Sequence, residues 1–161
     1  MADSDLAWPK LFDAPAARAA AALGPIPARI EHVGSTSVPG LPAKPVIDLD
    51  VVVTAADIPS AIERLAALGY AHKGDGGLPG REAFWSPRGE ARHHLYLCTP
   101  DAPAFQDHIL FRDYLRANPE IAREYAALKR ELGARHGADR AAYQTGKEGF
   151  IDAIMERVTL S

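Results

Sequence analysis

The sequence predicts a mixed α/β (α+β) fold, in which a mixed sheet is flanked by helices and followed by a helical C-terminal half. Short β-branched segments alternate with helical patterns in the N-terminal part. Beyond Pro100, apolar residues recur at the helical period in three successive segments. A chain of 161 residues can bury one sizeable core, so we expect a single domain over residues 1–161.

The N-terminal elements are expected in the order helix, strand, loop, strand, helix. The alanine-rich stretch from Pro15 to Leu23 stops at a Gly-Pro pair, as a helix does. Strands are expected at Ala28–Val33 and at Val46–Val53, where β-branched residues dominate. Asp57 then precedes an amphipathic pattern that runs to Leu68.

The later elements follow from glycines, prolines and apolar spacing. The glycine-rich segment Lys73–Gly80 is expected to be irregular, and strands at 83–85 and 92–98 should form a hairpin around residues 87–89. Asn118-Pro119 and Gly137 separate the three C-terminal helices.

Composition excludes several classes of protein. The formal net charge of -3 gives no basic excess, so long nucleic acid is not expected as a partner. Cys98 is the single cysteine, which rules out an intramolecular disulfide and suits a reducing cytoplasm. No apolar run approaches a membrane span, and Asp3 and Asp5 stand where a signal peptide carries positive charge. We therefore expect a cytoplasmic protein without a membrane partner.

Asp48 and Asp50 are the main candidates for chemistry. They lie two residues apart on the second expected strand, so both side chains leave the same face. Unpaired carboxylates in so apolar a strand would be costly, which indicates a compensating divalent cation. Magnesium suits carboxylate oxygens and leaves positions for phosphate. Alternatively, both acids lie at an exposed strand end and are simply solvated.

The loop before this strand is the candidate phosphate site. Gly34 opens a Gly-Ser-Thr-Ser run, whose flexible backbone and hydroxyls can face a phosphate, and Lys44 follows it. An ordinary polar turn has the same composition. Phosphate donors followed by two aspartates form the arrangement that phosphoryl or nucleotidyl transfer requires.

These residues resemble the GrpB-like proteins. The resemblance covers Glu31–Leu41, Ala43–Pro45 and Ile47–Asp50, and later Phe111–Arg116, Tyr125–Lys129 and Tyr143–Ile151. It implies a nucleotidyltransferase-like fold of the DNA polymerase beta superfamily, whose motif falls here on Val33-Gly34-Ser35 and Asp48-Leu49-Asp50. It also implies a link to coenzyme A metabolism, because GrpB-like domains occur fused to dephospho-coenzyme A kinase.

Two departures from the superfamily pattern are visible. Prolines 39, 42 and 45 restrict the segment after Gly-Ser to a turn or two, and strand 92–98 lacks the usual third carboxylate. His94 points to the outward side of that strand by alternation, with Tyr96, and is expected as a third metal ligand or as a base. Imidazole would make manganese or zinc alternatives to magnesium. A hydrogen-bonded structural histidine is the competing interpretation.

Further cations in the segments that resemble the family are expected to hold a triphosphate. Arg112 and Arg116 lie four apart on one helix. The same residues also suit a solvated surface, and Tyr125 with Lys129 suits a core aromatic beside a surface lysine. Trp85, Tyr114 and Tyr143 suit core or pocket walls. The expected nucleotide-binding set is His32, Gly34, Ser35, Thr36, Ser37, Lys44, Arg112, Arg116, Lys129, Tyr143 and Lys147.

The predicted function is metal-dependent transfer of a nucleotidyl group from a nucleoside triphosphate to a small acceptor. Asp48, Asp50 and His94 are the expected catalytic and metal-binding residues. A catalytically silent module that binds a nucleotide or is linked to coenzyme A is one alternative. Metal-assisted hydrolysis of a phosphoester is another.

Overall fold

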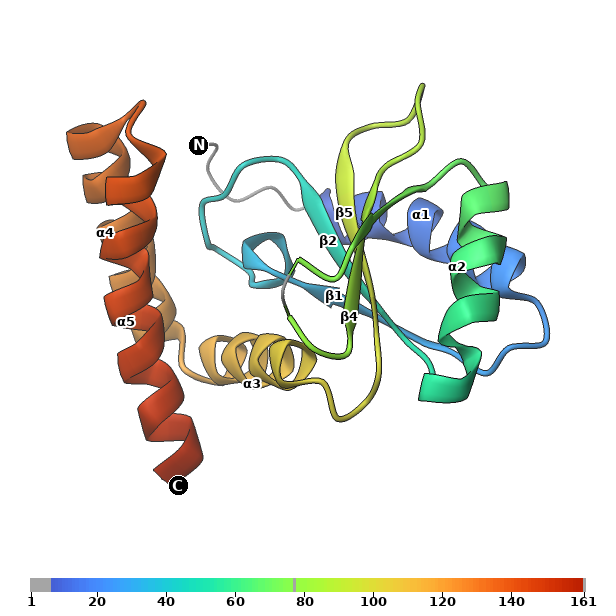
Figure 1. Ribbon diagram of the computed structural model, residues 1–161. Coiled ribbons are helices and arrows are strands. Elements are labelled where there is room, and N and C mark those ends of the chain that lie inside the picture. Colours follow the sequence, from blue (N-terminus) through green and yellow to red (C-terminus); the bar gives the residue numbers. More distant parts are fainter. Residues whose placement is uncertain (1–6, 77, 161) are drawn as a thin grey trace.

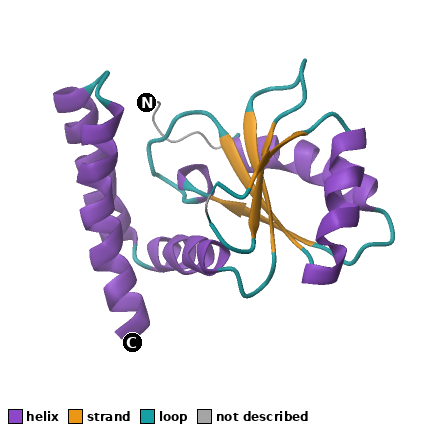
Figure 2. Cartoon of the chain, viewed as in Figure 1, coloured by secondary structure: helices purple, strands orange, loops and turns teal. Residues whose placement is uncertain are grey.

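The computed structural model describes residues 7–76 and 78–160, so Asp3 and Asp5 lie outside the described residues. Within these ranges the chain forms one five-stranded sheet with helices on both faces (Figures 1 and 2). The strands are β1 (Arg29–Val33), β2 (Ile47–Val52), β3 (Ala71–Gly74), β4 (Arg81–Trp85) and β5 (His93–Cys98). The helices are α1 (Trp8–Leu23), α2 (Ile58–Ala67), α3 (Pro103–Ala117), α4 (Pro119–His136) and α5 (Arg140–Leu160).

The sheet has the strand order β1-β2-β5-β4-β3. Strand β2 is parallel to β5 and antiparallel to β1, while β4 pairs antiparallel with β5 and β3. The predicted mixed sheet, the hairpin between β4 and β5, and the C-terminal helices are therefore confirmed. Strand β2 lies between two partners, and its odd-numbered residues Ile47, Leu49 and Val51 are buried.

Two boundaries differ from expectation. Helix α1 begins at Trp8 rather than near Pro15, because Trp8 itself is buried against Ile47 and Leu49. The segment Lys73–Gly80 is expected to be irregular, but its first two residues belong to strand β3, which ends at Gly74. Tertiary pairing with β4 overrides the low strand propensity of glycine there.

The two faces of the sheet are covered differently. Helices α1 and α2 bury Leu23 and Leu65 against one face, where Leu49, Val51 and Leu95 point. On the opposite face, Phe105 of α3 packs near the end of the sheet. Figure 1 shows α4 and α5 as an antiparallel pair that stands away from the sheet beyond α3.

The α4–α5 pair shares an apolar cluster with α3 and the loop before β2. Tyr125 stacks on Phe150 with ring centroids 5.1 Å apart, and Ile154 is 2% exposed. Gly146 lets the helices approach, since a Cβ there would overlap the Leu132 side chain. Among the described residues, no helix is sufficiently long and apolar to span a membrane.

Candidate functional site

Asp48 and Asp50 project from the same face of β2, as predicted. Their neighbours in the parallel register on β5 are His94 and Tyr96, so four polar side chains share this face. The odd-numbered residues of β2 point into the core under α1 and α2. The strand is therefore apolar on one face and carries its chemistry on the other.

Asp48 lies at the open end of this face. Its Oδ1 accepts a hydrogen bond from His94 Nδ1 at 2.7 Å, and its side chain is 25% exposed. Gly34 packs directly on Asp48, because a Cβ at position 34 would overlap the carboxylate oxygen Oδ2. The glycine of the predicted motif thus makes room for the first aspartate.

Asp50 lies deeper and has a partner that the sequence analysis did not identify. Its Oδ2 accepts a hydrogen bond from Nδ1 of His108 on α3 at 2.8 Å, and its side chain is 1% exposed. The second oxygen, Oδ1, is buried without a hydrogen-bond partner. The alternative of two solvated acids at a strand end is therefore wrong for Asp50.

The loop after β1 forms one 3-10 turn, Ser35–Ser37, in agreement with the restriction by its prolines. Thr36 Oγ1 bonds His32 Nε2 at 2.9 Å, and Ser37 Oγ donates to the Gly34 carbonyl. His32 stacks on Phe12 of α1, and burial lowers its pKa to about 4, with nearby Arg116 adding to the effect. His32 is therefore neutral near pH 7, and its hydrogen bond to Thr36 supports the loop.

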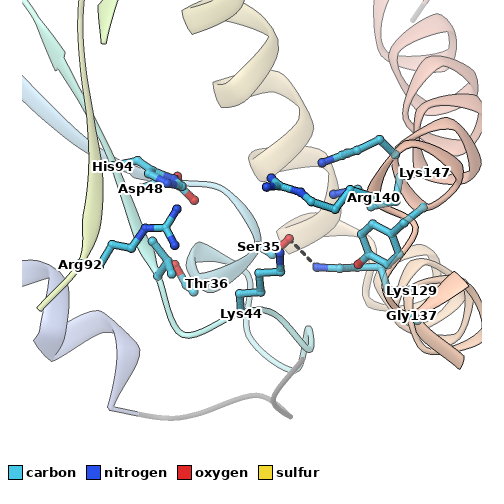
Figure 3. A pocket seen from close by; sticks show the side chains of 14 residues that line it. Ser35, Thr36, Lys44, Asp48, Arg92, His94, Lys129, Gly137, Arg140 and Lys147 are labelled. Carbon is cyan, nitrogen blue, oxygen red and sulfur yellow. Dashed lines mark hydrogen bonds and ion pairs between the residues drawn. The ribbon is translucent and has the colours of Figure 1, made fainter. Parts of the chain in front are cut away.

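A cavity of about 540 Å³ opens between this loop, the first residues of strands β2 and β5, and the α4–α5 pair (Figure 3). Ser35, Thr36, Asp48 and His94 form one wall. The opposite wall comes from α4 and α5 and includes Tyr143. The cavity gathers cations from both walls: Lys44, Arg92, Lys129, Arg140 and Lys147. Asp48 is the acidic side chain among the described lining residues.

Lys129 joins the two walls. It is 3% exposed, and its ammonium donates to Ser35 Oγ and to the Pro42 carbonyl, both at 2.8 Å. Burial lowers the pKa of Lys129 to about 8, and the neighbouring Lys147 contributes. The surface-lysine alternative is thus wrong, whereas Tyr125 is a core residue as expected.

Lys147 faces the same cavity. Burial lowers its pKa, and repulsion from Lys44 on the opposite wall lowers it further. Tyr143 lies one turn earlier on α5, with the Lys147 ammonium 4.9 Å from its ring centroid. Tyr143 and Lys147, which the sequence analysis included in the nucleotide-binding set, therefore line the same cavity as Ser35 and Thr36.

Arg112 and Arg116 lie outside the cavity lining. Arg112 Nη1 donates to Glu31 Oε2 at 2.7 Å and to the His32 carbonyl at 3.0 Å, and the residue is 8% exposed. Arg116 Nε donates to the Ser37 carbonyl at 2.9 Å. The structure therefore ties both arginines to the protein's own loop and strand. Ser37 and His32 likewise do not line the cavity.

The sequence analysis also missed Arg92, Arg140, Gln144 and His108. Arg140 and Gln144 precede Tyr143 and Lys147 by three residues, so the four residues form one stripe on α5. The helical spacing of Tyr143 and Lys147 leads to both, because Gln144 lies one turn before Lys147 and Arg140 lies one turn before Tyr143. Arg92 lies two residues before His94 at the start of β5. Trp85, expected in the core or a pocket wall, is 59% exposed.

The metal site stays a prediction. Within the described ranges, no group of three or more His, Cys, Asp or Glu side chains is arranged to hold a metal ion. Asp48 and Asp50 nevertheless present adjacent carboxylates, and His94 contacts Asp48 through Nδ1.

Comparison with known proteins places this geometry in a wider group. The chain is 39% identical over 150 residues to the UPF0157 protein YqkA of Bacillus subtilis, covering 92% of this chain and 44% of YqkA. It is 32% identical over 177 residues to a dephospho-CoA kinase of Mycobacterium bovis, covering 93% of this chain and 44% of the kinase. The chain thus spans less than half the length of both relatives.

Solved structures show the same fold. The crystal structure of the conserved protein GrpB from Enterococcus faecalis matches with a TM-score of 0.85 at 32% identity, over 97% of this chain and 94% of that one. The MgGTP-bound Cid1 poly(U) polymerase matches with a TM-score of 0.62 at 15% identity, over 89% of this chain and 50% of that one. The predicted nucleotidyltransferase-like fold is thus confirmed. The family model described as GrpB protein matches residues 1–157, so this chain belongs to the GrpB family.

Proposed function

We propose that this protein binds a nucleoside triphosphate in the cavity between the sheet and the α4–α5 pair, and transfers its nucleotidyl group to a small acceptor. The observation that carries the proposal is the charge distribution. A chain with a net charge of -3 gathers five lysines and arginines around one cavity whose rim holds Asp48. Such a concentration of cations suits a polyanion.

The phosphates would lie beside the loop. Ser35 and Thr36 line the cavity there, and Lys44, Lys129 and Lys147 line it as well (Figure 3). These cations would neutralise the charge that builds on the departing pyrophosphate. Fixed cations in a partly buried cavity need no reorganisation when that charge develops.

The carboxylates fit a divalent cation. Asp50 holds a buried oxygen without a partner, and the Asp48 carboxylate lies on the same face beside the glycine that makes room for it. Asp48 and Asp50 would hold the ion, with His94 orienting Asp48 through its hydrogen bond. Magnesium suits these oxygen donors, with manganese or zinc as alternatives, and it would polarise the transferred phosphoryl group.

The shared fold supports a nucleotide as the ligand. Cid1, with which the chain shares that fold, is a poly(U) polymerase whose structure is MgGTP bound. The similarity to a dephospho-CoA kinase instead supports a link to coenzyme A, for which the alternative is a binding module that forms no product. Both proposals use the same cavity and differ in product formation.

The test combines binding with product analysis. Calorimetric titration of the four nucleoside triphosphates with magnesium should show binding that Asp48→Asn abolishes, while Asp57→Asn, outside the cavity lining, leaves it unchanged. Pyrophosphate release with a nucleotidyl adduct supports transfer. Phosphate release alone would indicate hydrolysis, and binding without any product would indicate the silent module. Equal binding by wild type and Asp48→Asn would overturn the proposed site.

A further inference from the structure

Helix α3 presents a row of three donors to the site. His108, Arg112 and Arg116 are spaced four residues apart, so they lie on one face of the helix. Each contacts a different part of the scaffold that carries the candidate residues. His108 bonds Asp50 of β2, Arg112 bonds Glu31 of β1, and Arg116 bonds the carbonyl of Ser37.

The contact of His108 controls a carboxylate that has few other constraints. An ionised carboxylate only accepts hydrogen bonds, so His108 Nδ1 is the donor to Asp50 Oδ2. The other oxygen, Oδ1, is buried without a partner. Fixing one oxygen of a planar carboxylate fixes the direction of the second. His108 therefore determines where the unpartnered oxygen of Asp50 points.

The arrangement repeats that of the neighbouring aspartate. His94 Nδ1 bonds Asp48 Oδ1 at 2.7 Å, and His108 Nδ1 bonds Asp50 Oδ2 at 2.8 Å. The ring of Tyr96 lies between the two imidazoles, with its centroid 6.2 Å from each. Each carboxylate thus receives one imidazole from a separate element, His94 from β5 and His108 from α3.

We propose that His108 is a positioning residue that holds Asp50 with its unpartnered oxygen directed at the bound divalent cation. In naming the cation the inference rests on the proposed function, but the orientation of Asp50 is independent of it. Helix α3 thereby orients Asp50 through His108, as β5 orients Asp48 through His94. Partners of metal-binding carboxylates commonly tune metal affinity in this way.

Two substitutions separate positioning from packing. His108→Leu fills the same position with an apolar side chain and removes the hydrogen-bond donor. His108→Asn keeps a nitrogen donor bonded to Cγ, close to the place of Nδ1. His72→Leu is the matched control, because His72 bonds the Glu82 carboxylate at 2.8 Å elsewhere on the sheet. The probe is manganese alone, titrated calorimetrically without nucleotide.

His108→Leu should weaken manganese binding by roughly 10- to 100-fold. His108→Asn should restore most of the affinity, and His72→Leu should bind like the wild type. Wild-type affinity in His108→Leu would overturn the proposal. So would equal losses in the Leu and Asn variants, since a lost donor could not then be the cause.

A metal-free readout keeps this inference separate from the proposed function. In crystals grown without metal, the Asp50 carboxylate should turn in His108→Leu and keep its orientation in His108→Asn. An unturned carboxylate in the Leu variant would contradict the positioning role even if the wild type transfers nucleotides. Conversely, failure of the wild type to bind manganese or nucleotide would overturn the proposed function, while the crystals would still decide what orients Asp50.

Discussion

Gly34 and Asp48 touch so closely that no side chain fits at position 34: a Cβ there would overlap the carboxylate of Asp48. Gly34 also has a φ of 76°, in the left-handed region that favours glycine. The backbone at Gly34 thus packs directly on the first aspartate, and a side chain at position 34 would displace the carboxylate.

Gly34→Ala should therefore damage both the fold and the site. We expect a loss of roughly 1–3 kcal/mol in unfolding free energy from the backbone conformation, together with loss of metal and nucleotide binding. Gly40→Ala is the control, because Gly40 has a φ of 81° but open space around its Cβ position. Chemical denaturation and calorimetric titration measure the two effects. Equal ligand affinity in the two variants would show that the contact with Asp48 is unimportant.

Lys129 should make stability depend on pH in the alkaline range. Burial lowers its pKa from 10.5 to about 8. Between these values the unfolded chain binds a proton that the folded chain does not, so this residue makes stability rise with pH across that window. Lys129→Met should lack the rise, while the exposed Lys10→Met should keep it. Denaturant unfolding across the window checks this, and identical pH profiles for the wild type and Lys129→Met would refute it.

Arg112 should matter for folding more than for ligand binding. Its guanidinium is nearly buried and holds Glu31 and the carbonyl of His32. Arg112→Met leaves Glu31 with one partner fewer and should lower the free energy of unfolding by roughly 3 kcal/mol. Arg123→Met, an exposed arginine of α4, is the control. If Arg112→Met melts like the wild type but binds nucleotide more weakly, Arg112 binds phosphate and the predicted folding role is wrong.

Lys147 should behave in the opposite way. Its ammonium lines the cavity, so Lys147→Ala should weaken the binding of inorganic tripolyphosphate by roughly 1–3 kcal/mol, the range for hydrogen bonds to charged groups. The melting temperature should hardly change. The exposed Arg157→Ala on the same helix controls for a general change in charge. If both variants lose the same affinity, the cavity has no specific role in anion binding.

The α4–α5 pair should depend on Phe150. Its ring stacks on Tyr125 in the apolar cluster, and because Phe150 is half-buried, Phe150→Ala should cost roughly 3 kcal/mol, the low end of the range for core aromatics. A chain ended before Gly149 also lacks Ile151 and Ile154, and should lose its cooperative melt. Thermal unfolding followed by circular dichroism measures both. A truncated chain that melts like the wild type would show that the last helix is dispensable.

The sequence predicted the site best where the direction of a side chain depends only on the strand that carries it. The spacing of Asp48 and Asp50 predicted their shared face, because strand geometry fixes it regardless of the rest of the fold. The β5 alternation likewise placed His94 on the outward side of its strand, where it contacts Asp48.

It was least informative about what a helix faces. The spacing of Arg112 and Arg116 indicated a common side, and one further step back along α3 reaches His108. Nothing local says that this side meets β1, β2 and the Ser35–Ser37 turn rather than the cavity. Strand β3 was missed for a related reason, since its pairing with β4 depends on contacts outside the glycine-rich segment.

The opposed lysines on the two cavity walls give the protein a sensitivity to ions in its surroundings. Lys44 follows the loop and Lys147 belongs to α5. Burial lowers the pKa of Lys147 most, and repulsion from Lys44 lowers it further. Dissolved salt screens the two charges over a distance of about 8–10 Å. A polyphosphate chain between the walls would be attracted to both lysines at once, so its affinity for the cavity should fall as the ionic strength of the solution rises.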